Sequence, residues 1–361
     1  MNLAEKKLNL LCHGAKIDIS MDLGRKGGAG PAGGSSFILE NNPVINLPLW
    51  TKENKGSNFI LRKIDDNYAI YSKNNEKLMN LKKILEPKFY NLKTSDGILM
   101  KQIALLHGKD CLATTVFQRC IYWRSNLQCK FCAIEISLEQ GRTTSYKKHE
   151  QLLEVIKAGI EEGVITHCTF TTGTLKDRER EVQNYINLVK MIRKSYDIPI
   201  HVQLEPIKKK LIENLYSSGI DTIGIHIESF DEKILKEICP GKHINHGLED
   251  YKKSWEESVK IFGKNQVSSF ILLGLGESQD LNINGSIELL KLGVIPFLVP
   301  VRPLLKTEFN KISNMDYNEI FRTHKKIIGD FKRYGIDPNK SKAGCVRCNA
   351  CSAIKEFFKV L

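Results

Sequence analysis

From about residue 106 onward, short apolar runs alternate with longer helical patterns, and this alternation limits the possible folds more than any other feature. The expected strands are residues 112–116, 168–171, 200–204, 222–227, 267–273 and 294–299. The helical patterns are 149–162, 181–195, 208–218, 231–238, 251–262, 284–291 and 317–334. Strands rich in β-branched residues that alternate with helices predict a parallel sheet buried on both faces. We therefore expect an α/β fold with a six-unit βα barrel or part of one.

Residues 1–105 differ from this pattern and predict a small β-rich N-terminal domain. Short strand-like runs at 36–39, 44–49, 59–64 and 68–72 follow a glycine-rich stretch at 24–34. That stretch is able to hold a phosphate on its backbone N–H groups, with Arg25 and Lys26 beside it, or to form a tight turn or a lid. The expected boundaries are 1–105 for this domain, 106–335 for the barrel and 336–361 for a C-terminal tail.

Charge and composition narrow the function classes. The chain has 54 basic and 41 acidic residues and a formal net charge of +13, which favours anionic partners such as nucleic acid, an acidic carrier protein or a phosphorylated substrate. A solvated basic surface explains the same count, because the lysines are scattered. We expect no membrane span, no signal peptide and a cytoplasmic location. In a reducing compartment, ten cysteines suggest metal ligands rather than disulfides.

Cys120, Cys129 and Cys132 form a compact loop just after the first expected barrel strand. Working loops of barrel enzymes follow the carboxyl ends of the strands, so this is a suitable place for a cofactor. Three thiolates are able to hold an iron–sulfur cluster with one iron left open, while Phe131 shields it from water. The alternative is a zinc knuckle with Cys111 or His149 as fourth ligand.

A second cysteine group, Cys345, Cys348 and Cys351, lies in the tail with the spacing Cys-x2-Cys-x2-Cys. It suits an auxiliary cluster whose fourth site is filled by Cys111, Cys12 or substrate, and it also suits zinc. Cys111 is equally explained as an ordinary buried cysteine, and we interpret Cys168 and Cys239 as packing residues. We expect the tail to fold over the C-terminal mouth of the barrel. A position at the opposite face would favour a structural zinc clasp.

Polar residues and glycines follow the expected strands where a barrel would bind its ligands. These are Thr172, Gly173 and Thr174 after the second strand, Gln203 and Glu205 at the third, His226 and Glu228 at the fourth, and Gly274 and Gly276 after the fifth. His226 and Glu228 alternate along one strand, so we expect both to face the barrel interior. Arg302, after the sixth strand, suits either a substrate carboxylate or a surface ion pair.

Together these features resemble the radical S-adenosylmethionine (radical SAM) superfamily, although the usual cysteine spacing there is Cys-x3-Cys-x2-Cys and the first gap here is eight residues. A closer resemblance, to the radical SAM proteins of nitrilase-associated gene clusters, which are distant relatives of biotin synthase, spans nearly the whole chain. It rests on Gly27-Gly-Ala-Gly-Pro31, the cysteine loop through Ala133, Thr171-Thr-Gly-Thr174, Pro240-Gly-Lys242, Leu273-Gly-Leu-Gly276 and Ala343-Gly344 with the tail cysteines.

The resemblance implies an enzyme with a partial TIM barrel in which Cys120, Cys129 and Cys132 hold a catalytic [4Fe–4S] cluster. It implies that Thr172, Gly173 and Thr174 contact the methionine amino group of S-adenosylmethionine. The implied contacts to its ribose, carboxylate and adenine are Gln203, Glu205, His226, Glu228, Gly274 and Gly276. It further implies a small-molecule substrate and an electron donor such as ferredoxin or flavodoxin. Two other classes remain open, a zinc-stapled nucleic-acid-binding protein and a two-cluster electron carrier.

Overall fold

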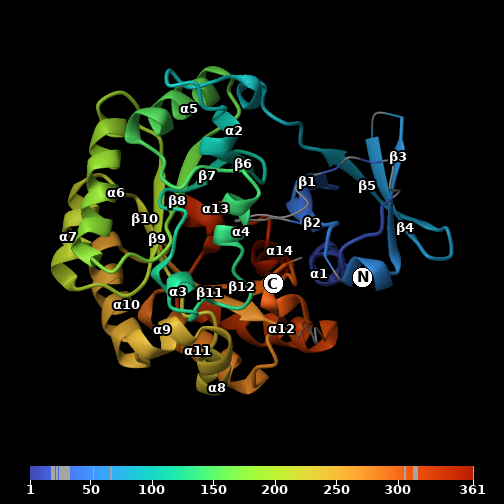
Figure 1. The fold of residues 1–361 in the computed structure, drawn as a ribbon. Helices are drawn as coiled ribbons and strands as arrows, with labels where there is room; N and C mark the ends of the chain where they lie inside the picture. The colour runs from blue at the N-terminus through green and yellow to red at the C-terminus, as the bar shows by residue number, and fades with distance from the viewer. Residues whose placement is uncertain are drawn as a thin grey trace.

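The computed structural model describes residues 1–17, 21, 23, 33–51, 53–65, 67–304, 306–311 and 316–360 (Figure 1). Most of the glycine-rich stretch, including Arg25, Lys26 and the segment 27–31, lies outside the described residues, so its phosphate-binding and lid hypotheses stay untested. No described helix has the length and the apolar character that crossing a membrane requires.

The large sheet has seven strands in the order β12-β11-β10-β9-β8-β7-β6. Its six parallel strands are β7 (Cys111–Thr115), β8 (His167–Thr171), β9 (Ile200–Leu204), β10 (Thr222–Ile225), β11 (Val267–Leu273) and β12 (Ile295–Pro300). The short β6 (Leu105–His107) pairs antiparallel with β7 and was not expected from the sequence. The expected α/β partial barrel is confirmed, because β12 and β6 remain separate edges and the sheet does not close.

Helices cover the outside of this sheet, as Figure 1 shows. They are α5 (His149–Glu161), α6 (Arg178–Arg193), α7 (Lys209–Ser217), α8 (Glu232–Ile238), α9 (Pro240–Asn245), α10 (Leu248–Phe262), α11 (Gln279–Leu292) and α12 (Tyr317–Arg333). The shorter α2 (Met100–Ile103) precedes β6, and α3 (Ile121–Arg124) and α4 (Ile134–Glu139) lie in the long connection after β7. Each expected helix is present, with bounds that differ by a few residues, because helix ends fray and short polar turns carry little periodicity.

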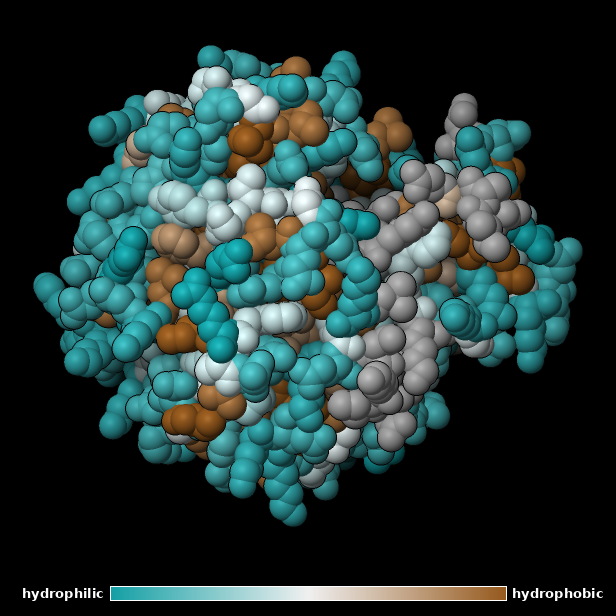
Figure 2. Space-filling model, in the orientation of Figure 1, coloured by the Kyte–Doolittle hydropathy of each residue, from teal (hydrophilic) through white to brown (hydrophobic). Residues whose placement is uncertain are grey.

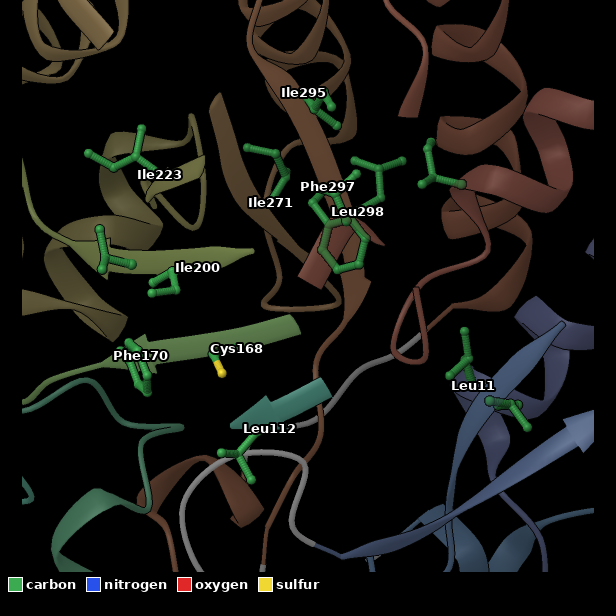
Figure 3. Close-up of a cluster of buried hydrophobic side chains, with 14 of the residues drawn as sticks. Leu11, Leu112, Cys168, Phe170, Ile200, Ile223, Ile271, Ile295, Phe297 and Leu298 are labelled. Carbon is green, nitrogen blue, oxygen red and sulfur yellow. The ribbon is translucent and has the colours of Figure 1, made fainter. Parts of the chain in front are cut away.

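The core lies between the sheet and these helices. Apolar side chains from successive strands meet there, including Leu112, Phe170, Ile200, Ile271 and Phe297 (Figure 3). All five are at most 1% exposed. Full burial of one such side chain stabilises the fold by roughly 1.5–3 kcal/mol, so the β-branched runs that marked the strands also supply the core. Cys168 is fully buried in this cluster, as a packing residue would be.

The N-terminal region forms a separate antiparallel sheet beside the barrel (Figure 1). Its strand order is β2 (Val44–Pro48), β1 (Gly34–Leu39), β5 (Lys77–Lys83), β4 (Asn67–Ser72) and β3 (Phe59–Ile64). The helix α1 (Leu3–His13) and strand β5 were not expected. Asn2 and Glu5 begin α1 with a capping box, in which each side chain accepts a backbone N–H of the other residue.

The tail does not fold over the C-terminal mouth as we expected. The backbone N–H of Gly344 donates to His167 Nδ1 (3.2 Å), and Arg347 Nη2 donates to Thr166 Oγ1 (2.9 Å), both at the start of β8. Gln266, just before β11, donates to the carbonyl of Lys340 (3.1 Å). The tail therefore enters from the N-terminal face of the sheet. Barrel helices run antiparallel to the strands, so α12 ends at that face and the chain continues there.

Two short helices, α13 (Gly344–Cys348) and α14 (Ile354–Val360), connect the tail to α1 and to the large sheet. Lys7 on α1 is fully buried, and its Nζ bonds Glu356 Oε2 (2.9 Å) and the carbonyl of Asn349 (2.8 Å). Asn349 Nδ2 donates to both oxygens of the same carboxylate. The N-terminal helix and the tail thus share one buried ion pair.

We expect Lys7→Met to lower the free energy of unfolding by about 3–5 kcal/mol, because it leaves the Glu356 carboxylate buried without its cation. The double variant Lys7→Met, Glu356→Gln should recover part of this loss. Urea unfolding followed by circular dichroism measures both. A single variant as stable as the parent would show that the pair is not buried in solution.

Candidate active site

The first cysteine group lies at the carboxyl end of β7. Cys120 is the N-cap residue of α3, and Cys129 and Cys132 lie between α3 and α4. Burial, together with the neighbouring Cys129 thiol, raises the pKa of Cys120 and raises that of Cys132 to about 12. The three thiols are therefore neighbours in an environment that keeps them protonated until a metal supplies positive charge.

Within the described part of the chain, no three His, Cys, Asp or Glu side chains converge as the ligands of one ion do. Three cysteines in one loop are a donor set that suits an iron–sulfur cluster. The residues Cys120, Cys129 and Cys132 are partly exposed, which leaves access for such a cluster.

Gly173 fixes the cysteine loop to the end of β8. Its N–H donates to the carbonyl of Phe117 (2.7 Å), and the N–H of Ile121 donates to the carbonyl of Thr174 (2.9 Å). A Cβ atom at position 173 would lie 2.3 Å from the carbonyl oxygen of Arg119 and 3.0 Å from the nitrogen of Cys120. The segment Thr172–Thr174 thus lies directly against the backbone at the start of the cysteine loop. Only glycine fits at position 173, because any side chain there would clash with this backbone.

Glu205 connects three of the surrounding segments. Its carboxylate accepts hydrogen bonds from Thr174 Oγ1 (2.7 Å) and Tyr122 Oη (2.9 Å), and it pairs with His246 Nε2 (3.0 Å). Arg178 Nη2 lies 4.0 Å away. Burial alone would raise the pKa of Glu205, but these donors and cations lower it to about 2. The carboxylate therefore stays ionised and holds the loops after β7, β8 and α9 together.

We expect Glu205→Gln to destabilise the protein by about 3 kcal/mol at pH 7, which is the free energy of lowering a carboxyl pKa from about 4.5 to about 2. A depressed pKa stabilises the fold above the ordinary pKa, and this contribution is lost as the pH falls from about 4.5 towards 2. The difference between parent and variant should therefore shrink over that range in urea unfolding experiments. A constant difference would contradict the role of the charge.

Glu228 and His226 lie beyond the end of β10, at the mouth of the sheet. Glu228 has a φ of 73°, so strand alternation does not set its direction as we assumed. Its carboxylate accepts from Lys242 Nζ (2.8 Å), which also donates to the carbonyl of His226 (3.0 Å). Burial alone would lower the pKa of Lys242, but Glu228 raises it well above its ordinary value, so the ammonium group of Lys242 stays charged.

His226 is buried against the aromatic ring of Phe270, with the ring centroids 4.0 Å apart. Its Nδ1 accepts the backbone N–H of Phe270 (3.1 Å), and its Nε2 is buried without a partner among the described residues. Burial lowers the pKa of His226 well below its ordinary value, so the imidazole is neutral. A neutral ring with an unused buried nitrogen is suited to bind a ligand group.

Gly274 and Gly276 form the turn after β11, with φ values of 95° and 93°. The side chain of Glu277 accepts the N–H groups of Gly274 (3.0 Å) and Leu275 (2.7 Å). Phe131 and Cys129 pack against a small apolar cluster nearby, which contains Ile238, Cys239, Leu272, Leu275, Val301 and Phe309. This cluster gives the cysteine loop an apolar wall. Cys239 lies in it and hydrogen bonds the Cys129 thiol.

The tail cysteines meet β6, β7 and β9 on the inner side of the sheet. Cys348 packs against Cys111, whose Sγ lies 3.2 Å from Thr169 Oγ1. Cys345 accepts from Gln203 Nε2 (3.4 Å), so Gln203 faces the tail as well as the sheet interior. Cys12 lies on α1 in the main apolar core. Cys111 thus lies beside the tail residue Cys348, and Gln203 hydrogen bonds the tail residue Cys345.

A cavity of about 540 Å³ separates the N-terminal sheet from the inner face of β7 and β8. At one end it is lined by His107 and Asn46, beside the tail cysteines. At the other end it is lined by Thr115 and Thr171, which pair in register just before the cysteine loop and the Thr172–Thr174 segment. The cavity therefore follows the inner face of β7 and β8, and no cysteine is among the described residues that line it.

Several site residues were not predicted from the sequence. Tyr122, Arg178 and His246 surround Glu205, and Lys242 was noted only as part of a motif. His107 lies between two tail sulfurs. These residues are distant from their partners in the chain, so no local spacing marks them. Arg302, predicted to bind a carboxylate or to lie on the surface, instead bonds Asn46 and faces Cys351 Sγ at 3.9 Å.

Comparison with known proteins identifies part of this architecture. Residues 124–281 match the family model of the Radical SAM superfamily. The match includes Cys129 and Cys132 and begins after Cys120. Bacteriochlorophyllide c C-7(1)-hydroxylase of Chlorobaculum limnaeum is 28% identical over 126 residues, which are 35% of this chain and 31% of that protein. A GTP 3′,8-cyclase of Clostridium botulinum (strain Hall) is 24% identical over 180 residues, 48% of this chain and 51% of that protein.

The chain thus spans about half or less of the length of these curated relatives. Among solved structures, a radical SAM methyltransferase from Sphaerobacter thermophilus aligns with a TM-score of 0.48 and 12% identity, covering 85% of this chain and 82% of that one. The hydrogenase maturase HydG from Carboxydothermus hydrogenoformans aligns with a TM-score of 0.48 and 18% identity, covering 62% and 52%. None of these matches addresses the narrower resemblance to nitrilase-associated proteins.

Proposed function

We propose that the chain is a radical SAM enzyme, because residues 124–281 match the Radical SAM superfamily model, and that Cys120, Cys129 and Cys132 hold its catalytic [4Fe–4S] cluster. The observation that carries this proposal is the cysteine loop at the carboxyl end of β7, fixed to the end of β8 by the close approach at Gly173. Loops at this end of the sheet carry the chemistry of barrel enzymes.

When bound, a cluster with one open iron supplies the electron that cleaves S-adenosylmethionine to methionine and a 5′-deoxyadenosyl radical, which removes hydrogen from a substrate. Around it, Thr172, Gly173 and Thr174 are proposed to bind the methionine amino group. Glu205, whose oxygens are already engaged, orients these loops. The apolar wall behind Phe131 excludes water from the cysteine loop.

Further contacts of S-adenosylmethionine are proposed at the mouth of the sheet. His226 offers an unpartnered Nε2, and Glu228, paired with Lys242, offers a second carboxylate oxygen to a ribose hydroxyl. The turn containing Gly274 and Gly276 carries no side chains at these two positions, so a flat adenine ring has room beside it. The amide nitrogen of Gln203 faces Cys345. We therefore propose that Gln203 contacts S-adenosylmethionine only from the interior of the sheet.

We propose that the substrate is a small polar molecule that binds in this cavity on the inner face of β7 and β8. Its volume of about 540 Å³ lies in the range of small-molecule sites. The side-chain hydroxyls of Thr115 and Thr171 line it and have no partner among the described residues, so they are available to a ligand. The end of the cavity lined by Thr115 and Thr171 lies at the carboxyl ends of β7 and β8, from which the chain continues into the cysteine loop and the Thr172–Thr174 segment.

The tail is proposed to hold a second iron–sulfur cluster on Cys345, Cys348 and Cys351, with Cys111 as fourth ligand. The contact between Cys348 and Cys111 supports this set. The tail enters from the N-terminal face, and this position alone would favour a zinc clasp. We favour a cluster because Cys345 and Cys348 continue along the inner side of the sheet beside the cavity. An electron donor such as ferredoxin or flavodoxin is the proposed partner.

Anaerobic reconstitution tests these proposals. With both sites filled we expect brown, oxygen-sensitive protein with about eight irons per chain. Addition of S-adenosylmethionine and dithionite should give 5′-deoxyadenosine, measured by chromatography, and more of it with the correct substrate. Stoichiometric zinc without iron would favour the zinc-stapled nucleic-acid-binding alternative. Iron without 5′-deoxyadenosine would favour the two-cluster electron carrier.

A further inference from the structure

The first gap of the cysteine loop is long. Eight residues, 121–128, separate Cys120 from Cys129, and an extended chain of that length reaches about 30 Å. The length of the chain alone therefore does not bring both cysteines to one cluster. The segment forms α3 and then turns back, with the N–H of Leu127 donating to the carbonyl of Tyr122 (2.7 Å). The direction of this turn decides where the second cysteine lies relative to the first.

The α8–α9 turn, residues 238–241, packs against this segment (Figure 1). Backbone hydrogen bonds join the two at two points. The N–H of Gly241 donates to the carbonyl of Leu127 (3.0 Å), and the N–H of Lys130 donates to the carbonyl of Ile238 (2.9 Å). The two bonds flank the second cysteine of the loop, so the α8–α9 turn fixes the backbone on both sides of it.

Gly241 allows the α8–α9 turn to come this close. It is buried, beneath a surface on which hydrophilic side chains predominate (Figure 2). A Cβ atom at position 241 would lie 2.4 Å from Cδ1 and 2.5 Å from Cγ of Tyr122, and 2.8 Å from the carbonyl oxygen of Leu127. The Tyr122 ring is held where it is, because it is only 6% exposed and its Oη donates to Glu205 (2.9 Å). A side chain at position 241 would therefore push the segment away.

The helix that follows the α8–α9 turn is itself held to the mouth of the sheet. Lys242 on α9 donates to the Glu228 carboxylate (2.8 Å) and to the carbonyl of His226 (3.0 Å), both beyond the end of β10. The Lys242 and Glu228 side chains are only 15% and 9% exposed. Because this ion pair joins α9 to the end of β10, α9 provides a fixed support for the cysteine loop.

We propose that Gly241 is a positioning residue for the catalytic cluster. It lets the α8–α9 turn close the eight-residue gap, so that Cys120 and Cys129 bind the same cluster. The inference rests on the proposed ligand set and goes beyond it by assigning a role to the glycine of Pro240-Gly-Lys242, which the proposed function does not use. Gly241 acts through the backbone of the cysteine loop and not by contact with the cluster.

The test uses a full-length chain in which Cys345, Cys348 and Cys351 are replaced by Ala, so that bound iron reports on the first cysteine group. After anaerobic reconstitution this chain should hold about four irons. Addition of S-adenosylmethionine should change the electron paramagnetic resonance spectrum of the reduced cluster. We expect Gly241→Ala to lower the bound iron at least about fivefold, as overpacking of a closed contact does, and to remove the change of the spectrum. The circular dichroism spectrum should stay that of the parent.

Two further variants separate the contact from other effects. Gly247→Ala is the matched control, because Gly247 caps the next helix, α10, and a Cβ there meets no atom closer than 3.9 Å. It should leave iron and spectrum unchanged. Tyr122→Ala removes the ring that the new Cβ would meet, so Gly241→Ala should lower the bound iron by only about twofold or less in that background. If Tyr122→Ala alone abolishes iron binding, the same comparison is made on the urea midpoints of the iron-free chains.

The outcomes separate the two proposals. A Gly241→Ala chain that binds iron and responds to S-adenosylmethionine as the parent does would overturn the present inference and leave the proposed function in place. Equal losses with and without the Tyr122 ring would also overturn it, and so would a general loss of the circular dichroism signal. A Cys120→Ala chain with as much iron as the parent would overturn the proposed ligand set itself, whatever Gly241→Ala does.

Discussion

Replacement of Cys129 by Ala is expected to abolish formation of 5′-deoxyadenosine from S-adenosylmethionine. The loop provides three thiolates, and the catalytic cluster proposed for it has no spare ligand. We expect a decrease of at least about a thousandfold, equivalent to about 4 kcal/mol of activation free energy. The measurement is single-turnover product formation with dithionite, together with iron content and the absorbance of the cluster.

Cys168→Ala is the matched control, because Cys168 is a fully buried cysteine of β8 that packs in the main core. It should retain iron and activity. Cys120→Ala deserves the same measurement, since the family match begins after this residue and its role as a ligand is a proposal from position alone. Undiminished 5′-deoxyadenosine in the Cys129 variant would mean that other cysteines bind the catalytic cluster.

The barrel could be predicted because its strands are continuous β-branched runs that also form the core. The range expected for β9, residues 200–204, agrees with the structure, as does that for β11, residues 267–273. The two strands that the sequence did not predict, β5 and β6, have weaker sequence patterns. β6 has three residues, and β5 reads Lys-Leu-Met-Asn-Leu-Lys-Lys, with polar residues at most positions. Local pattern cannot identify such strands, because their pairing partners, β7 and β4, provide most of their stability.

The site could be predicted in part for a similar reason. The cysteine spacing and the glycine at position 173 are local signals, and the structure places them against each other. The partners of Glu205 come from three separate segments, so only the fold reveals them. The expected position of the tail was wrong, because the local pattern of α12 does not show at which face of the barrel this helix ends. A helix that follows a parallel strand runs in the opposite direction.

Gly173→Ala is expected to remove iron from the catalytic site while most of the fold remains. The new Cβ would lie 2.3 Å from the carbonyl oxygen of Arg119 and 2.6 Å from its carbon. Both are backbone atoms, so no side-chain rotation relieves the clash, and the cysteine loop must move away from β8. We expect a loss of about 1–3 kcal/mol in unfolding free energy, as for other overpacked sites, and at least about a tenfold decrease in 5′-deoxyadenosine formation.

Gly329→Ala provides the control for this substitution. Gly329 lies within α12, and no heavy atom lies within 4 Å of a Cβ at that position. Alanine should stabilise this helix by about 0.5–1 kcal/mol and leave iron content and activity unchanged. The comparison separates a local displacement of the cysteine loop from a general effect of replacing glycine. If the Gly173 variant bound iron and formed 5′-deoxyadenosine as the parent does, the close contact between β8 and the cysteine loop would not position the catalytic cluster.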